Sequence, residues 1–481
     1  MKSPKVENHE GITIGILAFM GILITYVETM ITPALPVFVN VFNTNYDTLS
    51  WVLTAYIITG TTAAALFGKL ADIVGKKKIF LSLAIVYALA VSFGGFVNTI
   101  GELIAVRAVQ GLGFGMFPIA FAVLNDQVPR ERLALAQGII SSTFAGGSAV
   151  GLVGGAYITQ NFGWEWSYHS AIPLAFGLVI FAALFLKDYS VPRKEKIDFL
   201  GIGSLAIGLT TLIFGLSEGQ YLGWSSPEII GIFSGSLLSF IVFAWAESHV
   251  EKPFIDINLL KIRNVFLANF TGLFALAALF FLFYSIPPLL QDPSPAGFGQ
   301  SIFRSGLVLL PASILTMVFA SVAAKVTTNR GPKVAILIGS IILFFAYLGL
   351  LFNRGSIVSI SEDSAILGIG MSFIFVGVIN ILLISIPVSR SGEATGMNVV
   401  FRNIGMSIAP AIGGVLETVY TTNVVVGYLP YKLGQLPVVP IMTSFPSTRA
   451  FDSIYLVGIV FLVAAIIFTL MMKNIIVGKG R

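Results

Sequence analysis

The sequence has no cysteine and only three histidines among its 481 residues. The lack of cysteine excludes disulfides, thiolate metal sites and cysteine nucleophiles. The histidines, His9, His169 and His249, fall in or near expected loops. That placement argues against a haem protein or a histidine-cluster metal site.

Charge is also scarce. Asp, Glu, Lys and Arg make up 11% of the chain, whereas apolar residues make up 56%. A soluble domain carries about 25% charged residues, so this chain has too few to cover the surface of a soluble protein. Lipid must therefore be the solvent for much of it.

Apolar runs long enough to cross a bilayer follow one another along almost the whole chain. A span needs about 20 mainly apolar residues, and the runs between polar breaks predict fourteen transmembrane helices. The expected fold class is an all-α polytopic membrane protein. The spans lie near 11–39, 49–70, 78–98, 101–124, 134–159, 167–186, 198–218, 227–247, 264–290, 305–326, 333–353, 363–387, 394–418 and 451–472.

Basic residues mark one side of the expected membrane. Of the 28 Lys and Arg residues, 22 fall on the side of the two termini, four on the other side and two inside spans. Basic residues gather on the cytoplasmic side, so both termini are expected in the cytoplasm. The stretch 187–198 is then a basic cytoplasmic connection. The stretch 419–450, with four prolines, is expected to be an ordered or partly ordered external cap.

The chain contains an internal repeat. At an offset of 258 residues, special positions match without gaps: Pro129 with Pro387, Arg132 with Arg390, Gly138 with Gly396, Gly147 with Gly405 and Gly155 with Gly413. A second match, at an offset of 256, pairs Gly75 with Gly331 and Lys77 with Lys333. Both copies begin on the same side of the membrane, which is typical of transporters built from two parallel halves around a central cavity.

Three motifs carry a family resemblance. The loop after the second span runs from Gly68 through Asp72 and Gly75 to Lys78, the fourth span contains Arg107-Ala-Val-Gln110-Gly111, and the first span ends Glu28-Thr-Met-Ile-Thr-Pro33. In these motifs the sequence resembles the major facilitator superfamily, and in particular its fourteen-span drug:proton antiporter family.

The resemblance implies a major-facilitator fold. An N-terminal six-helix bundle would occupy residues 1–190, and an inserted helix pair with its linkers 191–260. A C-terminal six-helix bundle with the external loop would occupy 261–481. The resemblance also implies a proton-coupled secondary active transporter of the plasma membrane. It would export lipophilic or cationic compounds by alternating access.

The chain departs from the family pattern at several positions. Glu28 stands where the family usually has Asp, and Leu152 stands where the fifth-span antiporter motif has Pro. The repeat copy has that proline, as Pro410, and Thr328 stands opposite Asp72. These departures leave symport and uniport open beside antiport.

Ionisable residues inside spans are expensive and therefore functional candidates. At 1.5 Å per residue, Glu28 lies roughly 25 Å from the cytoplasmic end of its span and Arg107 roughly 10 Å from the outer end. The two could therefore meet at similar depth. Our hypothesis is that Glu28 is the proton-coupling carboxylate and Arg107 modulates it. The alternative is a static ion pair that holds the first and fourth spans together.

Other polar residues within spans are candidates for binding the substrate. Arg402 lies near mid-bilayer and either contacts a polar or anionic substrate or extends its charge towards the interface. Glu417 lies near the outer end of the same span. Tyr26, Gln110, Asn269, Tyr284 and Asn380 are further substrate-binding candidates, with hydrogen bonding between helices as the alternative. The phenylalanines Phe280, Phe281 and Phe283 could line an apolar cavity for a lipophilic substrate.

Two glycine-containing patterns have mechanical interpretations. Gly68, Asp72, Gly75, Lys76 and Arg132 are assigned to a conformational latch, because glycine permits a tight turn and Asp72 could accept from a helix N-terminus or a basic side chain. The alternative is a solvated basic loop. Gly147, Gly151 and Gly155 form a smooth face for helix packing. Packing alone accounts for them, and a sliding interface between the halves is the functional extension. Pro410 and Gly413 belong to the equivalent segment of the repeat.

Two transporter functions remain open. The first is a proton-driven exporter of lipophilic, often cationic, small molecules. The second is a facilitator for a polar or anionic metabolite, favoured by Arg402 and by the missing proline at Leu152. An intramembrane enzyme is disfavoured because the sequence has no HExxH, GxGD or nucleotide-binding loop. We expect protons, the lipid bilayer and a small-molecule substrate as partners. We expect no cofactor, no metal and no nucleic acid, and a monomer.

Overall fold

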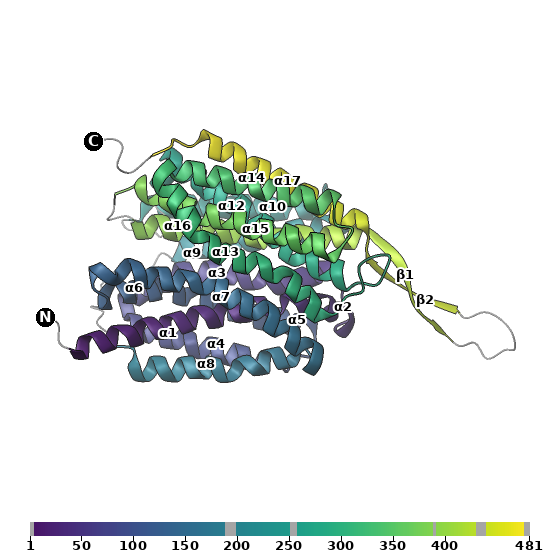
Figure 1. The fold of residues 1–481 in the computed structure, drawn as a ribbon, viewed down its shortest axis with the longest axis horizontal. Helices are drawn as coiled ribbons and strands as arrows, with labels where there is room; N and C mark the ends of the chain where they lie inside the picture. The colour runs from purple at the N-terminus through teal and green to yellow at the C-terminus, as the bar shows by residue number, and fades with distance from the viewer. Residues whose placement is uncertain (1–3, 188–198, 251–256, 388–390, 430–438, 476–481) are drawn as a thin grey trace.

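The computed structural model describes residues 4–187, 199–250, 257–387, 391–429 and 439–475. Long helices lie side by side along one common direction (Figure 1). At one end, here called the terminal end, α1 begins and α17 ends. At the other, here called the hairpin end, a two-stranded hairpin projects from the bundle.

The N-terminal half, purple to blue in Figure 1, contains ten helical segments. They are α1 (Pro4–Thr29), η1 (Thr32–Ala34), α2 (Leu35–Val41), α3 (Tyr46–Val74), α4 (Lys76–Gly94), α5 (Ile100–Gly111), η2 (Leu112–Gly115), α6 (Met116–Gln127), α7 (Arg130–Phe162) and α8 (Glu165–Phe185).

The rest of the chain contains nine helices and two strands among its described residues. They are α9 (Phe199–Leu222), α10 (Pro227–His249), α11 (Ile257–Leu260), α12 (Arg263–Gln291), α13 (Ile302–Arg330), α14 (Pro332–Phe352), α15 (Ile357–Ile384), α16 (Ser391–Val419), β1 (Thr421–Leu429), β2 (Val439–Pro446) and α17 (Thr448–Met471).

Thirteen segments of the described chain are long and apolar enough to cross a membrane. Each coincides with one of the expected spans. The fifth expected span, 134–159, lies within α7, which is 33 residues long but is not among the thirteen. The structure therefore supports a polytopic helical membrane protein, and the expected count of fourteen is not confirmed.

Two expected spans are interrupted. The first was predicted as one run over 11–39. Its α-helix α1 ends at Thr29, and the chain continues through the short helix η1 into α2. Pro33 and Pro36 lie in the first turns of these two segments, where a missing N–H is tolerated. The fourth expected span, 101–124, changes to a tighter helical turn at Leu112–Gly115. Broken helices are where transporters build their binding sites.

Helices at equivalent positions of the repeat pack in the same way. The pairs α1–α7, α4–α8 and α3–α5 in the first half correspond to α12–α16, α14–α17 and α13–α15 in the second. Gly75 and Gly331 end the equivalent helices α3 and α13 with φ of 123° and 92°, values that L-residues rarely adopt. The repeat predicted from the sequence is therefore also a repeat of packing.

The two halves meet along two symmetric contacts, α3 against α16 and α7 against α13. Helix α9 packs along α10 and also touches α3 and α16, so the inserted pair lies against this junction. Helix α12 is the most buried candidate span, with 78% of its apolar window inside the protein.

The external loop expected at 419–450 contains an antiparallel hairpin. Strand β1 pairs with β2 from Thr421 opposite Pro446 to Leu429 opposite Val439, with an irregularity between Val425 and Gly427. Valine and threonine are frequent in β1, and such β-branched residues favour strands. The cap is thus ordered at its base, while residues 430–438 lie outside the described chain.

Candidate functional site

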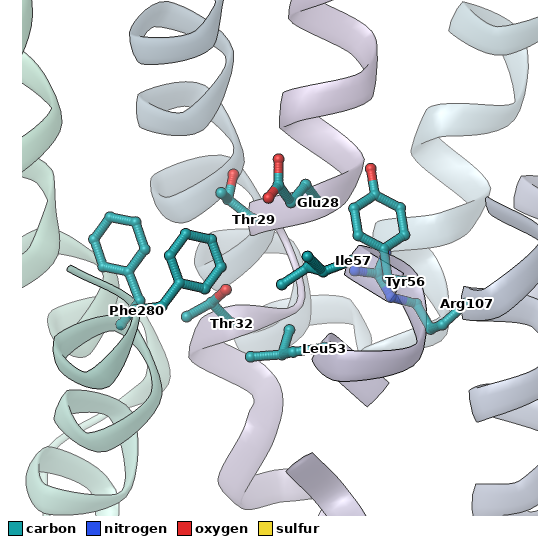
Figure 2. Close-up of a pocket in the computed structure, with 9 residues that line it drawn as sticks. Glu28, Thr29, Thr32, Leu53, Tyr56, Ile57, Arg107 and Phe280 are labelled. Atoms are coloured by element: carbon teal, nitrogen blue, oxygen red, sulfur yellow. The ribbon is translucent and has the colours of Figure 1, made fainter. Parts of the chain in front are cut away.

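A narrow pocket lies where the two halves meet, beside the break in the first span (Figure 2). Its lining comes from four parts of the chain. Glu28, Thr29 and Thr32 come from α1 and η1, Leu53, Tyr56 and Ile57 from α3, Arg107 from α5, and Phe280 and Phe283 from α12. The pocket therefore combines one carboxyl, one guanidinium and an apolar wall.

Arg107 is completely buried and is held by backbone carbonyls. Its Nε donates to the Val52 oxygen at 3.1 Å, and its Nη1 donates to the Val27 oxygen at 3.3 Å. Val27 lies in the last turn of α1, where carbonyls lack partners within the helix. The guanidinium also lies over the ring of Tyr56, 3.9 Å from its centre. Arg107 thus ties α5 to both α1 and α3.

Glu28 lines the same pocket and is 8% exposed. Within the described chain, Glu28 and Arg107 form no ion pair within 4.0 Å. The static ion pair considered from the sequence is therefore not formed in this structure. Glu28 instead presents its carboxyl to the pocket, close to a guanidinium fixed by other contacts (Figure 2). Such a carboxyl can gain or lose a proton without breaking a bond to Arg107.

Two of the polar candidates join helices of the first half. The Tyr26 hydroxyl and the Ser170 hydroxyl form a hydrogen bond of 2.9 Å between α1 and α8. Gln110 accepts from Arg107 Nη1 at 3.1 Å and donates to the Ala90 oxygen of α4 at 3.1 Å. Neither residue lines the pocket. Gln110 supports the site indirectly, because it holds the Arg107 side chain.

The other three polar candidates also bond within the protein. Asn269 accepts from the Asn398 side chain at 3.0 Å, joining α12 to α16. The Tyr284 hydroxyl donates to the Tyr46 oxygen of α3, so it connects the two halves. The Asn380 amide donates to the Val376 oxygen of its own helix at 2.8 Å. Like Tyr26 and Gln110, these three line neither the pocket at Glu28 nor the pocket at Arg402.

Arg402 lines a second pocket, inside the C-terminal half, together with Gly272, Asn398 and Phe375. Its guanidinium lies over the Phe375 ring, 4.5 Å from the ring centre, and its Nε is buried without a hydrogen-bond partner among the described residues. The sequence left open whether Arg402 contacts a substrate or extends its charge towards the interface. In the structure its side chain lines a pocket within the bundle.

The expected latch residues lie at the terminal end of the first half. Lys76 Nζ lies 2.6 Å from the Asp126 carboxylate of α6, and a Cβ at Gly68 would lie 3.3 Å from Pro118 of the same helix. These contacts hold the loop to its own half. Gly75 supplies the positive φ of the turn. The side chains of Asp72 and Arg132 lie outside the described residues.

The glycine face of α7 packs against α1. A Cβ at Gly147 would lie 1.9 Å from Thr25 Oγ1, at Gly151 2.1 Å from Thr29 Oγ1, and at Gly155 2.2 Å from the Met30 oxygen. A sliding interface between the halves, the functional interpretation of these glycines, is wrong for this face because α1 and α7 belong to the same half.

The equivalent segment of α16 packs against α12 and contains Pro410 within the helix. A Cβ at Gly413 would lie 2.8 Å from the Tyr284 ring. Leu152 is one of the α7 residues at the contact between the halves, and its oxygen would lie 2.6 Å from a Cβ at Gly306 of α13.

The sequence analysis did not identify Tyr56 and Phe375. The guanidinium of Arg107 lies over the Tyr56 ring, and that of Arg402 lies over the Phe375 ring. The chain has 14 tyrosines and 40 phenylalanines, so no compositional signal separates these two from the rest. The suggestion that Phe280 and Phe283 line a cavity agrees with the structure, whereas Phe281 lies outside the pocket lining.

Comparison with known proteins identifies the family. The model of the Major Facilitator Superfamily matches residues 17–410. The chain belongs to the Major Facilitator Superfamily. It is therefore a multi-pass membrane transporter, and the resemblance drawn from the Gly68 and Arg107 motifs is confirmed at the level of the superfamily.

Relatives in this superfamily include multidrug transporters. The chain is 27% identical to the multidrug transporter protein MdtP of Bacillus subtilis over 394 residues, covering 81% of this chain and 72% of that protein. It is 28% identical to the multidrug resistance protein 3 of the same organism over 79% of this chain and 74% of that one. It is 25% identical to the tetracenomycin C resistance and export protein of Streptomyces glaucescens, over 82% and 74% of the two chains.

Solved structures of Major Facilitator transporters share the fold. The xylose transporter XylE from E. coli, in a partially occluded inward-open conformation, matches with a TM-score of 0.64 over 98% of this chain and 99% of that one. The human organic anion transporter MFSD10 matches with a TM-score of 0.62 over 96% and 100%. The sequence identities are 12% and 14%, so these similarities describe the fold alone.

Proposed function

We propose that this protein is a proton-coupled exporter of lipophilic or cationic small molecules that works by alternating access in the plasma membrane. It acts as a monomer. Its parts are an N-terminal bundle over 1–190, an inserted pair over 191–260 and a C-terminal bundle over 261–481. With α7 counted, fourteen helices cross the membrane. The excess of basic residues at the terminal end then puts both termini in the cytoplasm and the hairpin outside.

The observation that carries this proposal is the composition of the pocket between the halves. Glu28 is a nearly buried carboxyl beside a fixed guanidinium, and Phe280 and Phe283 form the opposite wall. An apolar wall suits a lipophilic compound, and a carboxyl suits either its positive charge or a proton. A single carboxyl that binds the positively charged compound and the proton in turn exchanges the compound for the proton.

The hydrogen bonds between the halves support alternating access. Within the described chain they gather towards the hairpin end. One example is the Gln291 amide of α12, which donates to the Pro33 oxygen at 2.6 Å. Another is the Phe303 N–H of α13, which donates to the Gln160 side chain of α7 at 2.9 Å. The arrangement corresponds to a transporter closed on the outside, and export requires this end to open.

The test is transport in proteoliposomes with an imposed pH gradient and a mixed panel of lipophilic cations and anionic metabolites. We expect uphill movement of at least one lipophilic cation in the parent protein. We expect Glu28→Gln to lose uphill transport while it still binds or equilibrates the same compound, because the amide cannot carry a proton. Uphill transport by Glu28→Gln would disprove the coupling role.

Glu247→Gln provides a matched control. Glu247 is also buried, at 2% exposure, but lies in α10 of the inserted pair, away from the pocket. The same chemical change there should leave proton-driven transport near the parent rate. Equal losses in the two variants would show that the assay reports general damage from an amide in the membrane.

A second candidate function rests on Arg402. Arg402 lines the second pocket with Asn398, its Nε is buried without a hydrogen-bond partner among the described residues, and a guanidinium binds carboxylates and phosphates well. That feature favours a polar or anionic metabolite as the substrate. The anionic members of the same panel test it, with Arg402→Gln expected to abolish their transport and Glu28→Gln to spare downhill movement.

A further inference from the structure

Glu417, in the last turns of α16, is a buried carboxyl that the proposed coupling at Glu28 does not use. It is 0% exposed, and neither of its carboxyl oxygens has a hydrogen-bond partner among the described residues. An ionised carboxylate in such a place carries the full desolvation penalty. This side chain therefore needs either a proton or an opening to water.

A second acid lies at the end of α12, the helix that α16 packs against. Asp292, directly after α12, is 4% exposed and acts electrostatically on Glu417. The Tyr46 hydroxyl of α3 donates to both oxygens of Asp292, at 3.1 and 3.2 Å. Two acids that share a buried site disfavour double ionisation. Because Tyr46 belongs to the first half and Asp292 to the second, the pair lies on the boundary between the halves.

The remaining titratable groups around Glu417 are one acid and three tyrosines. Asp47, at the start of α3, is 3% exposed, and its N–H donates to Thr418 Oγ1 at 3.1 Å. Tyr46 of α3, Tyr284 of α12 and Tyr455 of α17 interact electrostatically with Glu417. The basic residue Arg354 acts on Tyr455 and is ion-paired with Asp452. Tyrosine hydroxyls stay protonated at neutral pH, so the carboxyls carry the titration at this site, and Asp292 and Glu417 are the two on the second half.

We propose that Glu417 and Asp292 form a second proton-binding site, which keeps the hairpin end closed while protonated and lets the halves separate when the proton leaves. The inference builds on the proposed function in one respect, that the hairpin end opens during transport. It adds a site 389 positions along the chain from Glu28, on a different helix and in the other half.

Two further observations favour a proton over a metal ion at this site. No cluster of three or more carboxylate or imidazole groups suited to a metal ion occurs among the described residues. Burial also raises the pKa of Asp292 to about 7, an effect larger than the opposing one of the Tyr46 hydrogen bond. A carboxyl in water releases its proton near pH 4. The closed end therefore becomes less favourable as the pH rises from about 4 to about 7.

The absence of native cysteine gives a direct test. Ser50 is 1% exposed, and its Cβ would lie 2.9 Å from a Cβ at Gly414 of α16, so a thiol there is reachable only when the hairpin end opens. We would label Ser50→Cys in proteoliposomes with a membrane-impermeant maleimide between pH 5 and 8. Rates would be divided by those of Ser225→Cys, an exposed site between α9 and α10, to remove the pH dependence of thiol reactivity.

The expected result is a relative labelling rate that rises about tenfold per pH unit between pH 5 and 7 and then levels off, because each unit inside the window between the two pKa values represents a factor of ten. Glu417→Gln and Asp292→Asn, each combined with Ser50→Cys, should stay at the low rate at every pH because an amide mimics the protonated acid. Asp363→Asn, a buried acid in α15 beside Gly349, is the matched control and should keep the parent profile.

A parent-like profile in both amide variants would overturn the proposal. Tyr46→Phe gives an independent and milder check. It removes the donor that favours the ionised Asp292, so the rise should move to higher pH, and an unchanged midpoint would count against the site. Replacing Na⁺ and K⁺ by N-methylglucamine should change nothing, whereas a dependence on either ion would refute a proton as the ligand.

The assay uses neither substrate nor gradient. A normal pH profile with failed uphill transport would therefore contradict the proposed function and leave this inference standing. Uphill transport that depends on Glu28, with a labelling rate at Ser50→Cys that does not change with pH, would support the proposed function and contradict this inference.

Discussion

The Arg107 guanidinium lies over the Tyr56 ring at 3.9 Å, and its nitrogens bond to the oxygens of Val52 and Val27. One side chain thereby holds three helices of the first half around the pocket that contains Glu28. These contacts fix the position of its charge beside the pocket carboxyl.

Arg107→Lys should reduce proton-driven transport by about tenfold or more. Lysine keeps the charge but has no planar fork to bond two carbonyls and stack on a ring, and each charged hydrogen bond contributes about 1.5–3 kcal/mol. The measurement is initial rate in proteoliposomes. Arg304→Lys, at an exposed arginine bonded to Gln300, is the control, and similar losses in both variants would contradict a special role for Arg107.

Gly155→Ala should destabilise the protein by about 1–3 kcal/mol, the usual range for overpacking. The added methyl would lie 2.2 Å from the Met30 oxygen, which belongs to the backbone directly after α1 and cannot rotate away. Gly146→Ala, on the same helix with nothing within 4 Å, should be neutral or slightly stabilising because alanine favours helix. Thermal unfolding in detergent would measure both, and matching melting temperatures would disprove the packing argument.

Lys76→Ala should change the free energy of unfolding by less than about 1 kcal/mol, since partly exposed ion pairs contribute little. The Lys76 and Asp126 side chains are 14% and 31% exposed. If the pair matters for switching, the transport rate will fall more than stability does, and the exchanged pair Lys76→Asp with Asp126→Lys will recover part of it. An undiminished transport rate in Lys76→Ala would remove the latch assignment from this residue.

Asp292→Asn should stabilise the protein in a pH-dependent way. In the parent protein the pKa of Asp292 is raised to about 7 by burial, so the folded state holds a proton that the unfolded state releases near pH 4. The parent therefore loses stability from about pH 4 to about pH 7 and no further above that. The stabilisation of Asp292→Asn over the parent should grow over this window and then level off, and melting curves at several pH values would show a constant difference if the assignment is wrong.

The fold was predictable because lipid imposes simple constraints. Every span must be long and apolar, and basic residues mark the loops, so the positions of the thirteen spans follow from composition alone. The breaks after Thr29 and at Gly111 were not predictable, since apolar sequence continues through both. The hairpin was not predicted because prolines disfavour strands, and two of the prolines of this loop lie in β2. The valines of β1 alone did not outweigh them.

The site was predictable only where charge is rare. Glu28, Arg107 and Arg402 stand out because so few charges lie within spans, and the first two line one pocket. Asp292 reads in the sequence as an ordinary loop acid. Its burial depends on Tyr46, 246 positions earlier and in the other half, and no local pattern encodes such a contact. Tyr26, Gln110 and Asn269 look the same in sequence whether they face a substrate or another helix.

The free energy of the hydrogen bonds between the halves can be compared with the energy that the membrane potential supplies to a moving charge. Each contributes about 1 kcal/mol, while one elementary charge that crosses a membrane potential of 100 mV provides about 2.3 kcal/mol. A junction held by contacts such as Tyr284 to Tyr46 and Gln291 to Pro33 is therefore matched to the work that one or two translocated charges can supply. Voltage alone, at constant pH, should then change how often the outer end opens.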